Sequence, residues 1–137
     1  MSELLTPRQK GLVRESFATV GEYSDSVVQL FYGRLFELEP AARGMFHIGI
    51  KEQSGKLLDM LSTIVGALDN FEDLRPKLGE LGRRHVTYGV TPEHYQTLKV
   101  ALLWALGRAL DAEFDRETRA AWSELLDAVA GAMLAPE

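Results

Sequence analysis

The sequence predicts an all-α protein. Apolar residues recur at helical spacing along almost the whole chain, and Pro or Gly stands near most of the segment boundaries. No Asn-Gly or Asp-Gly pair joins two alternating runs, as a β-hairpin would require. A chain of 137 residues has the size of one domain with one core, so residues 1–137 are expected to form a single domain.

The first two helices are marked at their ends. Thr6 is placed as an N-cap with Pro7 at the first helical position, and Gly21 is placed as the end of this helix. A second helix is expected over 24–38. Pro40 then marks a corner, because the residue before a proline is biased out of the helical region.

The middle of the chain predicts two further helices. The third covers about 50–68 and is broken at 69–70 by an Asp-Asn pair. We expect Pro76 to open the next helix, which carries His85, and Gly89 to close it.

Two helices complete the chain. Thr91 and Pro92 form another cap-and-proline pair, and this helix is expected to reach about Leu110. Asp115 caps the last helix, in which Trp122 lies on the apolar face. The expected architecture is six long helices and a short corner joined by short loops.

Composition excludes several classes of protein. The 46% hydrophobic and 26% charged residues are a soluble, globular balance, and no run of about 20 apolar residues indicates a membrane span. The N-terminus lacks the pattern of a signal peptide, so a cytoplasmic location is expected. The absence of cysteine excludes disulfides and thiolate ligands to metals. A net charge of −5 disfavours nucleic acid as a partner.

His85 stands on an apolar face. Leu81, Leu78 and Leu74 precede it at spacings that place all four side chains on one side of a helix. A neutral imidazole aimed into an apolar space is a common way to present one nitrogen to an iron. A core histidine bonded to a backbone carbonyl explains the same stripe, and the stripe alone does not separate these interpretations.

Two more polar residues occupy inward positions. Tyr32 and Gln53 lie on the apolar stripes of their own helices, and a buried hydroxyl or amide needs a partner. Each has a simple alternative, since the Tyr32 hydroxyl could reach the surface and Gln53 could be hydrated in its first helical turn. Together with His85, they form a set of polar groups on three helices that is typical of a core holding a cofactor.

The chain resembles the globins over nearly its full length. The closest likeness is to single-domain bacterial haemoglobins and the haem domain of flavohaemoglobins, with some likeness to neuroglobin. The segments that carry the resemblance are LFYGRLFELEP (30–40), MF (45–46), EQSGKLL (52–58), LGRRHVTYGV (81–90) and AAWSELL (120–126).

The resemblance implies a globin fold with its helices packed around a haem pocket, and roles for single residues. His85 would be the proximal iron ligand and Phe46 would stack on the porphyrin. Tyr32 and Gln53 would line the distal pocket, and Leu57 would supply its apolar wall. Because the chain has no Cys-x-x-Cys-His motif, the haem would be a non-covalent haem b.

The distal pair implies a preference for oxygen. Neuroglobin-like chains carry a histidine where Gln53 stands, and an amide does not readily bind iron, so the unliganded ferrous iron would be five-coordinate. The Tyr32 hydroxyl and the Gln53 amide are both donors to bound oxygen. Bonds to a charged acceptor contribute ~1.5–3 kcal/mol, which corresponds to roughly tenfold to hundredfold tighter holding. Carbon monoxide is less polar and gains less.

The remaining candidate positions are weaker. In the bacterial relatives a tyrosine–glutamate pair orients the proximal histidine. Tyr95 matches the tyrosine but could equally be a packing residue, and Glu137 is a terminal residue and a poor match for the glutamate. Lys56, Arg83 and Arg84 would pair with haem propionates, or they are ordinary solvated charges.

The favoured function is reversible oxygen binding, for storage, delivery or scavenging. The alternative is a nitric oxide dioxygenase, in which case a separate reductase would return the iron to its ferrous state. Dioxygen, nitric oxide and carbon monoxide are the expected ligands, with no nucleic-acid or membrane partner. A haem-based sensor would need an output domain, and a haem-free module would not need Phe46 together with His85.

Overall fold

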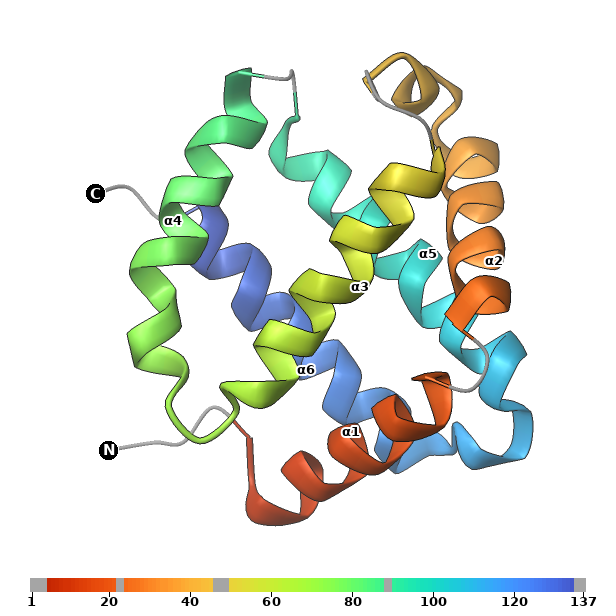
Figure 1. Cartoon of the computed structure of the whole chain (residues 1–137), viewed down its shortest axis with the longest axis vertical. Helices are drawn as coiled ribbons and strands as arrows, with labels where there is room; N and C mark the ends of the chain where they lie inside the picture. Colours follow the sequence, from red (N-terminus) through yellow and green to blue (C-terminus); the bar gives the residue numbers. More distant parts are fainter. Residues whose placement is uncertain (1–4, 22–23, 46–49, 88–89, 135–137) are drawn as a thin grey trace.

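The computed structural model describes residues 5–21, 24–45, 50–87 and 90–134. Within these ranges the chain forms six α-helices, two short 3-10 helices and no strand, so the prediction of an all-α fold is confirmed (Figure 1). The elements are α1 (Pro7–Val20), α2 (Ser24–Leu38), η2 (Pro40–Met45), α3 (Ile50–Gly66), α4 (Phe71–Thr87), α5 (Pro92–Leu110), η3 (Asp111–Glu113) and α6 (Arg116–Leu134).

The caps predicted from the sequence hold the helix ends. The Thr6 hydroxyl accepts a hydrogen bond from the Gln9 amide at 3.1 Å, and the Gln9 side chain accepts one from the Thr6 amide at 2.9 Å. Asp115 accepts a bond of 2.9 Å from the Thr118 amide at the start of α6. Each bond satisfies a backbone donor that the helix itself leaves unpaired.

The predicted start of α4 is wrong. The helix begins at Phe71, and Pro76 lies inside it instead of opening it. A proline in this position removes one hydrogen bond, the one that would end on the carbonyl of Glu72. Glu72 and Pro76 are both exposed, so water can reach this carbonyl. Meanwhile Phe71 and Leu74 are buried, and their packing favours the earlier start.

The helices pack in pairs. α2 lies along α5, α4 along α6, and α1 packs against α6. In Figure 1, α3 crosses the view diagonally between α4 and α2. α4 and α5 follow one another directly, so residues near the end of α4 come close to the start of α5.

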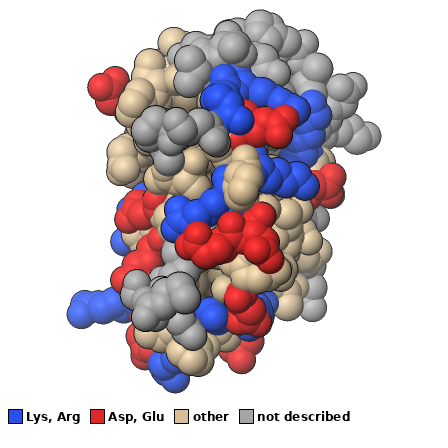
Figure 2. Space-filling model, turned by 90° about the vertical axis from the view of Figure 1, so that its left-hand side faces the viewer, with Lys and Arg blue, Asp and Glu red and all other residues tan. Residues whose placement is uncertain are grey.

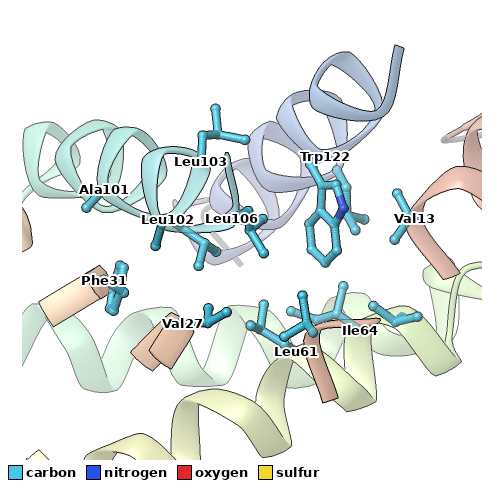
Figure 3. Close-up of a cluster of buried hydrophobic side chains, with 14 of the residues drawn as sticks. Val13, Val27, Phe31, Leu61, Ile64, Ala101, Leu102, Leu103, Leu106 and Trp122 are labelled. Carbon is cyan, nitrogen blue, oxygen red and sulfur yellow. The ribbon is translucent and has the colours of Figure 1, made fainter. Parts of the chain in front are cut away.

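A tryptophan occupies the centre of the core. Trp122 on α6 is fully buried, and its indole N–H donates a 2.8 Å hydrogen bond to the Ser16 hydroxyl on α1. Figure 3 shows its ring among apolar side chains that include Val13 and Ile64. Ser16 in turn donates to the Leu12 carbonyl at 2.7 Å, so both buried polar groups have partners.

One glycine sets the separation of α4 and α6. Gly82 is buried, and a Cβ atom there would overlap the backbone carbonyl of Met133 on α6. Any larger residue would therefore push these two backbones apart. Because Gly82 lies one turn before His85, the same contact fixes the end of α4 that carries the histidine.

The surface carries charges that follow the helix dipoles. α4 begins with Glu72 and Asp73 and ends with Arg84, which is the favourable order for its macrodipole. Figure 2 views the molecule from the side on which α4 lies and shows basic and acidic side chains interleaved over this face. Among the described helices, none combines the length and the apolar character needed to cross a membrane.

Candidate functional site

His85 lies in the last turn of α4 and is half-buried. Its Nδ1 atom is 2.8 Å from the carbonyl oxygen of Leu81, one turn earlier. A carbonyl only accepts, so Nδ1 carries the proton and Nε2 carries the lone pair of the neutral ring. Metal-binding histidines commonly donate their other nitrogen in this way, which fixes the ring orientation.

The apolar stripe before His85 is confirmed. Leu74 and Leu78 are buried, and Leu81 is half-buried. The bond to Leu81 is also what a purely structural histidine would make, so the bond determines the tautomer without deciding the role. The sequence left a bond to some backbone carbonyl open as an alternative, and the structure shows that the acceptor is the carbonyl four residues earlier.

Tyr95 supports His85 from the next helix. It is buried near the start of α5, and its ring centroid lies 6.5 Å from that of His85 at an interplanar angle of 33°. Burial raises the pKa of the Tyr95 phenol, which keeps it neutral. The Val90 amide also donates to the His85 carbonyl at 3.0 Å, so backbone and side chains tie the two helices together here.

Tyr32 is buried in the middle of α2, as its position on the stripe predicts. The ring of Phe31 lies edge-on to it with centroids 4.9 Å apart, and that of Phe36 stacks at 6.0 Å. Burial raises the pKa of Tyr32 to about 12, because the phenolate would lose its hydration. At neutral pH the side chain is therefore a protonated phenol with a hydrogen to donate.

Only part of the predicted distal group can be described. Leu57 on α3 is half-buried and packs against the same apolar cluster that contains Tyr32, whereas Lys56 is exposed. Gln53 lies in the first turn of α3, and its side chain is outside the described residues, as is all of Phe46. Their contacts stay predictions. Among the candidates, the structure thus groups Tyr32 with Leu57 in one apolar cluster, and His85 with Tyr95.

The basic candidates are exposed. Arg84 pairs with Glu80 on its own helix at 2.9 Å, and both side chains are more than half exposed. An exposed pair of this kind contributes little to stability, so Arg84 could exchange Glu80 for another carboxylate at small cost. Arg83 is also exposed, and Glu137 lies outside the described residues.

Sequence reasoning missed the aromatic surroundings of Tyr32 and the glycine behind His85. Phe31 and Phe36 appear on the predicted apolar stripe, but the pattern does not reveal how their rings lie against the phenol. The sequence does not indicate that Gly82 is a helix contact, because the need for a glycine there depends on the Met133 backbone that lies against it. Both features position candidate site residues.

Comparison with known proteins identifies the family. The family model described as Globin matches residues 29–133, a stretch that contains Tyr32, α3, His85 and Tyr95. The chain belongs to the globin family. This agrees with the resemblance seen in the sequence and with the all-α fold.

Two kinds of globin relative stand out. Neuroglobin-1 of Oncorhynchus mykiss is 28% identical over 96% of this chain and 91% of its own length, and neuroglobin of Danio rerio is 27% identical over the same shares. A flavohemoprotein of Deinococcus radiodurans is 30% identical over 93% of this chain. The match spans only 34% of the flavohemoprotein, so this globin covers about a third of that relative. Globin membership implies haem-based oxygen binding.

Proposed function

We propose that this globin holds one haem b through His85 and binds oxygen reversibly, with residues 1–137 acting as a single domain. The observation that supports it most is the match of residues 29–133 to the Globin family model, a stretch that contains His85. The hydrogen bond from His85 Nδ1 to the Leu81 carbonyl is compatible with this role. With the proton on Nδ1, the Nε2 lone pair is the group that a haem iron takes as its proximal ligand. The donor set, a neutral imidazole and no cysteine, fits a non-covalent haem.

Tyr95 acts as a positioning residue for His85. Its ring lies against the imidazole from α5, and the Val90 bond holds the end of α4 at the same place. These contacts restrict rotation of the imidazole about its bond to the backbone. A ring held in this way loses little freedom when Nε2 binds.

Tyr32 acts on the opposite side as a hydrogen-bond donor to the ligand. The haem iron supplies reversible binding of dioxygen when the cofactor is present. The neutral Tyr32 phenol, kept protonated by its burial, then offers a donor to a polar ligand. We place Gln53 beside it as a second donor, Leu57 as apolar wall and Phe46 as the ring that stacks on the porphyrin. With an amide at position 53, the unliganded ferrous iron would be five-coordinate.

Lys56 and Arg84 serve as partners for the haem propionates. Both side chains are exposed cations, on α3 and near the end of α4 respectively. Arg84 would leave or share Glu80 for this purpose, which costs little at an exposed position. They would contribute to haem orientation more than to its retention.

The test of the proposal is the visible spectrum of the protein reconstituted with haem. The His85→Ala variant should lose proximal coordination, and added imidazole should restore a ligated spectrum. His94→Ala is the matched control, because its Nδ1 accepts a bond from the Thr91 amide at a helix start and has no proposed role at the iron. A ferrous spectrum unchanged in His85→Ala without imidazole would refute the assignment.

A second candidate is nitric oxide dioxygenase activity with electrons from a separate reductase. The similarity to a flavohemoprotein, of which this chain matches about a third, favours it. In this role the residues of the pocket would be the same, and the difference would be the supply of electrons. The residues of the site therefore do not distinguish oxygen binding from catalysis. The number of nitric oxide molecules consumed per haem distinguishes them.

The turnover experiment measures nitric oxide consumed per haem. The oxygenated protein should consume about one equivalent by itself, since each event leaves ferric iron. Sustained consumption should appear only when a flavin reductase and a nicotinamide donor are added. Many turnovers with the nicotinamide alone would contradict the need for a separate reductase. No further turnover with the reductase present would leave oxygen binding as the activity.

A further inference from the structure

A groove lies on the outer side of α5, where this helix turns through η3 into α6. Its volume is about 310 Å³, and its walls include Val100, Trp104, Arg108, Phe114 and Arg119. None of these residues takes part in the candidate haem site. The groove therefore needs an explanation of its own.

The groove is built by the local backbone. A Cβ atom at Gly107 would stand 3.4 Å from the Phe114 ring, so the glycine lets this ring lie close against α5. Asp111 has a positive φ of 51°, a conformation that non-glycine residues rarely adopt, at the sharp turn between α5 and η3. The turn thereby brings the Phe114 ring back against α5, directly after the acidic residues of η3 in the chain.

Basic groups form one side of this surface. The guanidinium of Arg108 lies 5.7 Å from the centre of the Trp104 ring, and Arg119 is exposed across the groove. In the part of the chain that the structure describes, neither arginine has a carboxylate within ion-pair distance. Both charges are available to an external partner.

Acidic groups lie in the turn that follows α5. Asp111 and Glu113 are exposed on η3, which leads into the groove residue Phe114, and within the described ranges neither pairs with a cation. Val100 adds an apolar side chain that is 50% exposed. Tryptophan, phenylalanine and arginine are the residue types enriched in protein–protein interfaces.

We propose that this surface, defined by Val100, Trp104, Arg108, Asp111, Glu113, Phe114 and Arg119, docks a second copy of the same chain about a two-fold axis. A symmetric dimer requires one patch to be complementary to itself. Here the arginines of one protomer would meet the acidic turn of its partner, and the converse contact would form across the axis.

The occupant follows from the two signs of charge. A small anion or an acidic peptide would use only Arg108 and Arg119 and would face repulsion from η3. A second copy uses both halves of the patch at once. Stable interfaces bury about 1,200–2,000 Å² in total, and this groove is small, so the dimer should be weak and concentration-dependent.

The experiment is sedimentation velocity on the full chain over a wide range of concentrations. The wild-type protein should pass reversibly from monomer to dimer. Arg119→Glu and Glu113→Arg should each weaken the dimer by about tenfold or more, because two like-charge contacts replace two attractive ones. An equimolar mixture of the two variants should recover the affinity, since every cross-axis contact is then attractive again. Both positions are exposed, so folding should be preserved and is checked by thermal unfolding.

Arg116→Glu is the control, since it makes the same charge change at an exposed position of α6 that does not line the groove. It should leave dimerisation within about twofold of wild type. A protein that stays monomeric at every concentration would overturn the proposal. So would a dimer that ignores both charge reversals, or one that Arg116→Glu weakens equally. Loss of the dimer in both variants without recovery in their mixture would also reject the two-fold pairing.

Discussion

Local surroundings set the chemical state of the two residues that we propose act on either side of the haem. The Leu81 carbonyl fixes which nitrogen of His85 carries the proton, and burial between two phenylalanines keeps Tyr32 protonated. Neither effect needs a charged neighbour. An imidazole whose Nδ1 faces a carbonyl on one helix and a protonated phenol on another suit a cofactor whose ligands are small and uncharged.

Tyr32→Phe tests the donor. The change removes only the hydroxyl, and the loss of ~1.5–3 kcal/mol of bonding to a polar ligand should speed oxygen dissociation roughly tenfold to a hundredfold. Carbon monoxide dissociation, measured by the same ligand-replacement kinetics, should change far less. Equal effects on both gases would mean that the side chain acts through pocket shape, and no effect on either would remove Tyr32 from the ligand site.

The buried phenol also predicts a dependence of stability on pH. Below pH 10 the folded and unfolded chains both keep the Tyr32 proton. Between about pH 10 and pH 12 the unfolded chain releases it while the folded chain retains it, so the free energy of unfolding falls as the pH rises. Tyr32→Phe should make this fall shallower, as measured by urea unfolding at several alkaline pH values. Burial raises the pKa of Tyr95 in the same direction, so this residue contributes to the slope that remains. An identical slope in the variant would contradict the burial of Tyr32.

At the scale of the residue, sequence reasoning was strong where the pattern is local. The stripes that place His85 and Tyr32 on the apolar faces of their own helices are patterns of this kind. The bond between Trp122 and Ser16 joins α6 to α1, and no periodicity reports that their polar atoms meet. The ring of Tyr95 lies 6.5 Å from that of His85 on the next helix, a proximity between helices that spacing alone could not predict.

At the scale of the element, local signals predicted most helix ends to within two residues, α3 ending at Gly66 where about 68 was expected, and tertiary packing determined the start of α4. Gly89, which was predicted to close α4, lies outside the described residues. Thr6, Gly21 and Asp115 act as expected, because a cap bonds to a backbone group a few residues away. Pro76 misled the prediction, because a proline near a helix start can be either its first residue or an interior one. Burial of Phe71 favours the longer helix, and that burial depends on the rest of the molecule.

Gly82→Ala tests the close approach of α4 and α6. The added methyl would meet the Met133 carbonyl, and overpacking of this kind typically costs about 1–3 kcal/mol. Gly131→Ala on α6 is the matched control, since a Cβ there meets nothing within 4 Å and alanine is the better helix former by roughly 0.5–1 kcal/mol. Urea unfolding should therefore show opposite signs for the two variants. A neutral or stabilising Gly82→Ala would mean that the helices are not held at this distance.

At the scale of the whole molecule, one helix serves two surfaces. The start of α5 carries Tyr95 against His85, its buried side packs on α2 and α6, and its outer side carries the groove proposed for a second copy. The sequence predicts that this helix exists and where it begins and ends. It does not predict the groove, which depends on Phe114 returning across Gly107. Polar residues on the surface follow no regular spacing, so the sequence does not show that the chain folds back over α5 at this point.

Haem binding should stabilise the whole molecule through linkage. A ligand that binds only the folded chain adds stability in proportion to the logarithm of its concentration over its dissociation constant, about 4 kcal/mol at a thousandfold excess. The haem-free protein should therefore unfold at a lower urea concentration than the haem-loaded protein. His85→Ala should lose most of this difference, whereas His94→Ala, altered at a helix start with no proposed role at the iron, should retain it. The comparison within each variant cancels any effect of the substitution on the haem-free fold. An equal gain in His85→Ala and wild type would mean that the haem is held by the apolar pocket and not through this histidine.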